Sequence, residues 1–168
     1  MAHKYRLVQD CLEDVLPKLY EQTDKKQELI RVLDFGPFKH RIDDGIELRK
    51  ATFECMNLLL DVALPHIHIQ EYLQHLRKGL ADENDIKLLC YPMLIKLCSI
   101  AEADVIAEID KIIDPLHKTL TKTISPDAVK HEVTSHLSHQ KQMSSFWVSS
   151  RENGIKNWST AASRQSMR

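Results

Sequence analysis

Glycine is scarce in this sequence, with 4 among 168 residues, and this scarcity disfavours the many tight turns of a sheet-rich fold. The formal net charge is −1, so no overall charge directs the protein to nucleic acid or to an anionic membrane. No apolar run approaches the roughly 20 residues of a membrane span. Acidic residues such as Asp10 and Glu13 interrupt the apolar pattern near the N-terminus, which is atypical of a signal peptide. We therefore expect a helical protein without a membrane span and without direct nucleic-acid binding.

Motifs of catalysis and cofactor binding are also missing. The sequence has no glycine-rich phosphate-binding motif and no CxxC pair. His131, Glu132 and His136 resemble a zinc-protease helix, but the two histidines are five residues apart instead of four. We expect no metal, no cofactor and no enzymatic activity. The four cysteines, expected to be reduced and mostly buried, are Cys11, Cys55, Cys90 and Cys98.

Apolar residues recur at three- and four-residue spacings through most of the chain, as in amphipathic helices. The periodicity predicts helices over about residues 3–22, 44–64, 68–81, 86–100 and 103–119, and a sixth from about Pro126. The fourth segment is apolar nearly all round, which predicts that it packs between neighbours. Asp44, with Glu47 three residues later, predicts a capping box at the start of the second helix. The apolar pattern fades after Val133, and from Gln140 the sequence is rich in polar residues without a period, so residues 140–168 are expected to form a disordered or loosely attached tail.

The starts of two helices resemble each other, which indicates an internal repeat. Glu47-Leu48-Arg49-Lys50 aligns with Asp85-Ile86-Lys87-Leu88 at an offset of 38 residues. Two-helix units of about 40 residues are typical of HEAT repeats, which stack into solenoids. The sequence therefore predicts an all-α, HEAT-repeat-like α-solenoid of about three helix pairs over residues 1–139. A plain irregular helical bundle is the alternative.

One connection is far longer than this repeat requires. The helices of the second pair are joined by Asp82 to Asp85, whereas about residues 23–44 separate those of the first pair. Two short segments within this insert are rich in strand-forming residues and flank Gly36-Pro37, a dipeptide that favours a turn. We therefore expect a β-hairpin inserted in the first inter-helix loop.

The tip of this hairpin is the candidate functional site. Phe35 and Phe38 either anchor the hairpin to the helices or contact a partner. The positive charges of Lys39, His40 and Arg41 either protect an exposed strand edge or bind an acidic or aromatic partner.

Several short motifs in and after the insert form a distinctive combination. They are Glu28-Leu29-Ile30-Arg31, Gly36-Pro37-Phe38-Lys39-His40, Asp43-Asp44-Gly45, Leu48-Arg49-Lys50-Ala51, Phe53-Glu54-Cys55, Asp114-Pro115-Leu116 and Val129-Lys130-His131-Glu132. Together they resemble the extreme C-terminal region of the CAND family, the cullin-associated, neddylation-dissociated proteins, also described as TATA-binding-protein-interacting proteins. The resemblance covers about residues 12–132, a small fraction of the family's length, and the sequence diverges from Val133 onward.

The resemblance implies a non-catalytic protein-interaction module of the cytoplasm and nucleus. Family members are long HEAT solenoids that bind unmodified cullins and promote exchange of substrate receptors on cullin-RING (SCF-type) ubiquitin ligases. The resemblance implies that this chain binds the N-terminal region of a cullin in competition with a Skp-type adaptor. The residues implied as contacts are Phe35, Gly36, Pro37, Phe38, Lys39, His40, Arg41 and Asp43. Binding of the TATA-binding protein, and an inactive part of a longer CAND protein, are the alternatives.

Overall fold

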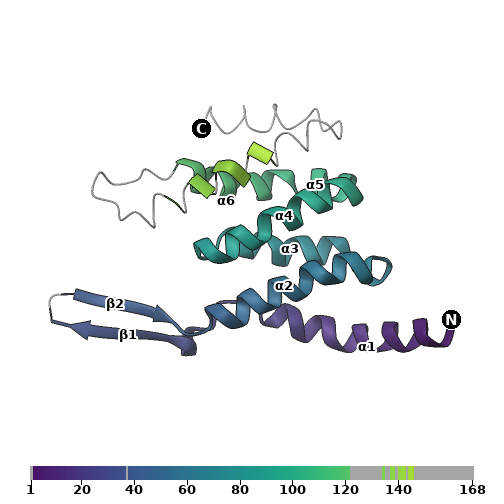
Figure 1. Ribbon diagram of the computed structural model, residues 1–168, viewed down its shortest axis with the longest axis horizontal. Helices are drawn as coiled ribbons and strands as arrows, with labels where there is room; N and C mark the ends of the chain where they lie inside the picture. The colour runs from purple at the N-terminus through teal and green to yellow at the C-terminus, as the bar shows by residue number, and fades with distance from the viewer. Residues whose placement is uncertain are drawn as a thin grey trace. The chain divides into compact units, whose positions relative to one another are not determined.

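The computed structural model describes residues 2–36 and 38–121, together with residues 134, 137–138, 140–142 and 144–145. The chain divides into two compact units, residues 1–67 and 68–168. Helices dominate both units, and a single two-stranded sheet occurs among the described residues (Figure 1). The fold class is all-α with a small hairpin insertion, as expected for a helical-repeat protein.

The first unit contains two helices with the hairpin between them. Its elements are α1 (Ala2–Glu21), the 3-10 turn η1 (Gln27–Leu29), β1 (Ile30–Phe35), β2 (Phe38–Asp43), α2 (Ile46–Val62) and the 3-10 turn η2 (Leu64–His66). The hairpin extends away from the end of α1 and the start of α2 (Figure 1). Phe53, Met56 and Leu60 recur at three- and four-residue spacings on α2 and are at most 3% exposed, so they form its buried face.

The second unit is a helical cluster. Its described helices are α3 (Ile69–Leu80), α4 (Asn84–Ile100), α5 (Glu102–Ala107) and α6 (Ile109–Thr121). α3 packs against α4, α5 and α6, and α4 packs against α5. Buried side chains lie on several sides of α4, including Ile86, Tyr91 and Leu94. This burial confirms the prediction that the nearly all-apolar segment packs between neighbours.

Most predicted helices are present within two residues of their expected ends, but one is divided. The stretch expected as a single helix over residues 103–119 is broken at Glu108 into α5 and α6. No glycine or proline marks the break, so periodicity alone predicts a continuous helix. The carbonyl of Glu108 accepts the backbone N–H of Ile112 at 3.1 Å and starts α6.

The cysteines differ in part from the expectation that most of them are buried. Cys90 and Cys98 are buried, whereas Cys11 and Cys55 are exposed, and all four are free thiols. Pro17, Pro92 and Pro115 lie inside α1, α4 and α6. None of the described helices is both long and apolar enough to cross a bilayer.

Two predictions fall mainly on undescribed parts of the chain. The helix expected from Pro126 and the His131–His136 pair lie outside the described residues. Of the expected tail, only residues 140–142 and 144–145 are described, and they are helical. The boundary at residue 139 stays a prediction.

Candidate functional site

The predicted hairpin is present at the predicted position. β1 and β2 pair antiparallel from Ile30 opposite Asp43 to Phe35 opposite Phe38. Gly36 directly follows Phe35 with a φ of 72°, in the left-handed region that glycine adopts most easily. Because Phe35 pairs with Phe38, Gly36 occupies the first central position of the turn.

The base of the hairpin is fixed by Asp43, the last residue of β2. The Asp43 carboxylate accepts two hydrogen bonds from the Arg49 guanidinium of α2, at 3.2 Å and 2.8 Å. The backbone N–H of Gly45 donates to the same carboxylate at 3.0 Å, and Lys25 Nζ lies 3.3 Å from it. The side chains of Arg49 and Asp43 are only 2% and 12% exposed. Two bonds with this geometry hold the hairpin in a defined orientation on α2.

Asp44, the residue directly after β2, is bonded to Arg31 of β1 at the same end of the hairpin. Its carboxylate accepts hydrogen bonds from Nε of Arg31 and, at 2.7 Å, from Nη2 of Arg31. Its backbone N–H donates to the Leu29 carbonyl at 2.9 Å. The predicted capping box is therefore wrong: Gly45 is the N-cap of α2, without a side-chain cap, and the Glu47 carboxylate accepts from Lys50 instead. The Asp44 carboxylate, which the sequence pattern predicts to cap the start of α2, therefore accepts hydrogen bonds from Arg31 instead.

The arginines at the hairpin base also lower the pKa values of its two carboxylates. Hydrogen bonding from Arg49 lowers the pKa of Asp43 from 3.8 to about 2. The Arg31 hydrogen bonds likewise lower the pKa of Asp44. Both carboxylates are therefore ionised at neutral pH, which keeps both ion pairs intact.

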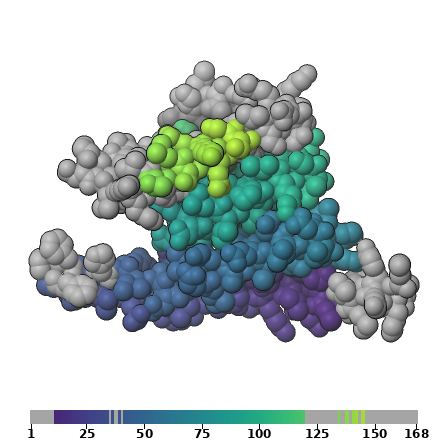
Figure 2. Space-filling view, in the orientation of Figure 1, coloured from purple at the N-terminus to yellow at the C-terminus, as the bar shows by residue number. Residues whose placement is uncertain are grey.

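Beyond this base, the hairpin carries exposed apolar and cationic side chains. Val32 is 60% exposed and Ile42 is 37% exposed, and the cross-strand pairing places them on opposite faces. Lys39 and Arg41 of β2 are exposed as well. Figure 2 shows the hairpin as the blue extension beyond the helices of its own unit. These side chains are available to a partner along the hairpin.

The predicted contact residues thus divide into three groups. Gly36, Lys39 and Arg41 are exposed on the turn and on β2. Asp43 is engaged within the chain at the hairpin base. Pro37 and the side chains of Phe35, Phe38 and His40 lie outside the described residues, so their contact role stays a prediction.

A second exposed surface, which the sequence pattern had not singled out, lies on α2. Apolar residues occupy both a buried and an exposed side of this helix. Leu48, Leu58 and Val62 are 45%, 62% and 78% exposed, in contrast to Phe53 and Leu60. The exposed apolar row of α2 consists of Leu48, Ala51, Cys55, Leu58 and Val62. The buried row and the exposed row both repeat at spacings of three and four residues, so the spacing alone does not tell which of them is buried.

Within the described part of the chain, no three His, Cys, Asp or Glu side chains gather as a metal site requires. The hairpin presents exposed apolar and cationic side chains on strands whose base is fixed to α2.

Comparison with known proteins assigns the family. The sequence signature of the TIP120 family, described as "TATA-binding protein interacting (TIP20)", matches residues 7–158. This match extends beyond residues 12–132 at both ends, so the expected divergence from Val133 onward is wrong at the level of the family signature.

Curated relatives agree with this match. "Cullin-associated NEDD8-dissociated protein 2" of Rattus norvegicus is 43% identical over 131 residues, which are 78% of this chain and 10% of that protein. "Cullin-associated NEDD8-dissociated protein 1" of Arabidopsis thaliana is 44% identical over 77% of this chain and 11% of its own length. "Cullin-associated NEDD8-dissociated protein 1, C-terminal part" of Emericella nidulans is 34% identical over 78% of this chain and 13% of its own length.

The chain thus spans about a tenth of the length of the first two relatives. It belongs to the TIP120 family, the family of the cullin-associated NEDD8-dissociated proteins.

Proposed function

We propose that this chain is a non-catalytic protein-interaction module that binds the N-terminal region of an unmodified cullin. Through this contact it regulates the assembly of cullin-RING ubiquitin ligases and the exchange of their adaptors and substrate receptors, in the cytoplasm and nucleus. The names of its relatives, which describe cullin-associated proteins, support this proposal. The relatives are much longer, so the chain supplies one contact of the kind that they make.

One observation carries the proposal: the hairpin is held firmly at its base while its length remains exposed. The Arg49–Asp43 pair fixes the base. Val32 and Ile42 remain exposed further along the strands. An exposed two-stranded hairpin is marginally stable by itself, and anchoring reduces the entropy that a partner must remove on binding.

The hairpin is the proposed point of competition with a Skp-type adaptor. Its apolar side chains supply burial against the cullin, and Lys39 and Arg41 add positive charge beside them. Asp43 contributes by positioning the strands through Arg49.

A pull-down with a purified unmodified cullin N-terminal region tests this function. The chain is expected to retain the cullin, and an excess of the Skp-type adaptor is expected to release it. Replacing both Phe35 and Phe38 by Asp is expected to abolish retention while leaving the helical circular dichroism unchanged. If retention survives both substitutions, the hairpin tip is not the contact.

Binding to the TATA-binding protein is the second candidate, and the description of the family as TATA-binding protein interacting favours it. The same pull-down with the TATA-binding protein as the bait distinguishes the two functions. Retention by this bait but not by the cullin would support the second candidate.

A further inference from the structure

The second unit contains a basic pocket that the hairpin function does not use. The pocket has a volume of about 540 Å³ and lies among α3, α4 and α6. Five cationic side chains from these three helices line it, namely Arg77, Lys78, Lys87, Lys111 and Lys118. The net charge of the whole chain is −1, so this concentration of positive charge is local.

The Glu108 carboxylate lies beside two of these cations. Glu108 Oε2 lies 3.4 Å from Nη1 of Arg77, and Oε1 lies 2.9 Å from Nζ of Lys111. Arg77 and Lys111 therefore share this carboxylate. Arg77 and Lys111 are 35% and 60% exposed, so both remain accessible from solvent.

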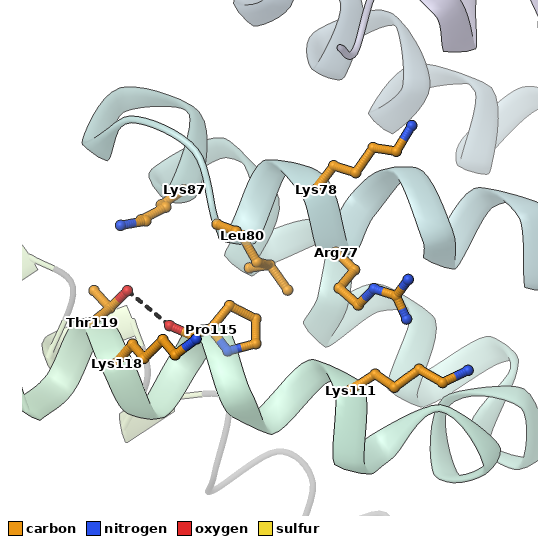
Figure 3. A pocket seen from close by; sticks show the side chains of 9 residues that line it. Arg77, Lys78, Leu80, Lys87, Lys111, Pro115, Lys118 and Thr119 are labelled. Carbon is orange, nitrogen blue, oxygen red and sulfur yellow. Dashed lines mark hydrogen bonds between the residues drawn. The ribbon is translucent and has the colours of Figure 1, made fainter. Parts of the chain in front are cut away.

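Four of the five cations lie at two ends of the pocket, with apolar side chains between them. Arg77 and Lys111 lie toward one end in Figure 3, and Lys87 and Lys118 lie toward the other. Leu80 and Pro115 lie in the middle. The Thr119 hydroxyl donates to the Pro115 carbonyl at 2.9 Å, so its hydrogen is used within α6.

We propose that this pocket binds an acidic segment of a partner protein, in which acidic residues flank an apolar side chain. The two cationic ends match two groups of carboxylates, and the apolar middle matches the side chain between them. A compact phosphate is less suited to the pocket, because it requires cations that converge on one point. Nucleic acid is less suited because its backbone requires a longer basic track.

Fluorescence anisotropy with the full chain tests this proposal. The probe is a fluorescein-labelled peptide of sequence Glu-Glu-Leu-Leu-Glu-Glu. The double variant Lys87→Glu/Lys118→Glu is expected to weaken peptide binding at least about tenfold. The matched control Lys18→Glu/Lys26→Glu reverses two charges on the first unit and is expected to change binding by less than about twofold.

A third variant is expected to bind the peptide more tightly than the wild type does. Glu108→Gln is expected to strengthen binding about threefold, because it releases Arg77 and Lys111 from their shared carboxylate. The backbone carbonyl of Glu108, which starts α6, is unaffected by this change. Circular dichroism of each variant verifies that the helices remain folded.

Three results would overturn the proposal. The first is equal weakening by the pocket variant and by the matched control. The second is equal binding of the peptide Glu-Glu-Ala-Ala-Glu-Glu, which would remove the role of the apolar middle. The third is complete displacement of the peptide by inorganic pyrophosphate at a lower concentration than unlabelled peptide, which would assign the pocket to a free phosphate compound.

Discussion

Arg49 Nη2 lies 2.8 Å from Asp43 Oδ2, and this part-buried ion pair, in which the Arg49 side chain is only 2% exposed, joins the inserted hairpin to the helix that follows it. Removing one partner from a buried ion pair typically costs about 3–5 kcal/mol, because the other charge is left without compensation. The orientation of the hairpin therefore depends on these two residues more than on any exposed contact.

The first prediction concerns the stability that this pair supplies. Asp43→Asn is expected to lower the free energy of unfolding by about 3 kcal/mol, because the Arg49 charge stays buried. The double variant Asp43→Asn/Arg49→Met is expected to recover part of the loss, with a coupling of about 1–3 kcal/mol. Urea unfolding followed by circular dichroism measures both values.

The exposed pair at the same end is the control. Arg31 and Asp44 are 61% and 38% exposed, so Arg31→Met is expected to cost less than about 1 kcal/mol. An equal cost for the two pairs would contradict the distinction between them.

A second prediction concerns pH. The folded-state pKa of Asp43 is lowered to about 2, so its contribution to stability is fully present above the ordinary value of 3.8. It is lost as the pH falls from about 4 to about 2, and the loss is roughly 2 kcal/mol. Urea unfolding across this range is expected to show a smaller loss in Asp43→Asn than in the wild type. Identical pH dependence in both proteins would contradict the assignment.

The two hairpin glycines are predicted to respond to substitution in different ways. A Cβ at Gly45 would lie 3.1 Å from Leu29 Cδ1 and 3.3 Å from Nη1 of Arg49, so Gly45→Ala is expected to cost about 1–3 kcal/mol. A Cβ at Gly36 meets nothing within 4 Å, and Gly36→Ala is expected to cost about 1–2 kcal/mol through its positive φ alone.

NMR titration of the Asp43 carboxyl separates these two causes. Gly45→Ala is expected to raise the pKa of Asp43, because it displaces the Arg49 guanidinium. Gly36→Ala is expected to leave that pKa unchanged, and a shift in both variants would contradict the explanation.

A fourth prediction tests the exposed row on α2. Leu58 is 62% exposed and Leu60 is 3% exposed, although they are two residues apart. Leu58→Glu is expected to change the free energy of unfolding by less than about 0.5 kcal/mol, whereas Leu60→Glu buries a charge and is expected to prevent folding. Thermal unfolding of the two variants measures the difference, and equal destabilisation would show that both faces are buried.

Local sequence was sufficient to predict the hairpin. Strand-forming residues on both sides of Gly36 and a scarcity of glycine elsewhere restrict the turn to one place, and the structure has the strands there. The Arg49–Asp43 pair was not predicted, because Asp43-Asp44 before a helix also matches a capping signal. Only the folded chain shows that Arg31 and Arg49 take the two carboxylates.

Features that depend on distant residues were beyond the sequence argument. Periodicity predicted the helix α2 but not which of its apolar residues are buried. The break at Glu108 has no glycine or proline to mark it. The basic pocket combines residues of α3, α4 and α6 that share no spacing, so no linear motif reveals it.

The most direct test of the proposed function is the affinity of the chain for an unmodified cullin N-terminal region, measured by surface plasmon resonance. The double variant Val32→Asp/Ile42→Asp places charges on both exposed faces of the hairpin while the Arg49–Asp43 anchor remains. The account predicts measurable binding of the wild type and at least about tenfold weaker binding of this variant. Equal affinity of the two proteins, with the helical circular dichroism of both intact, would contradict it.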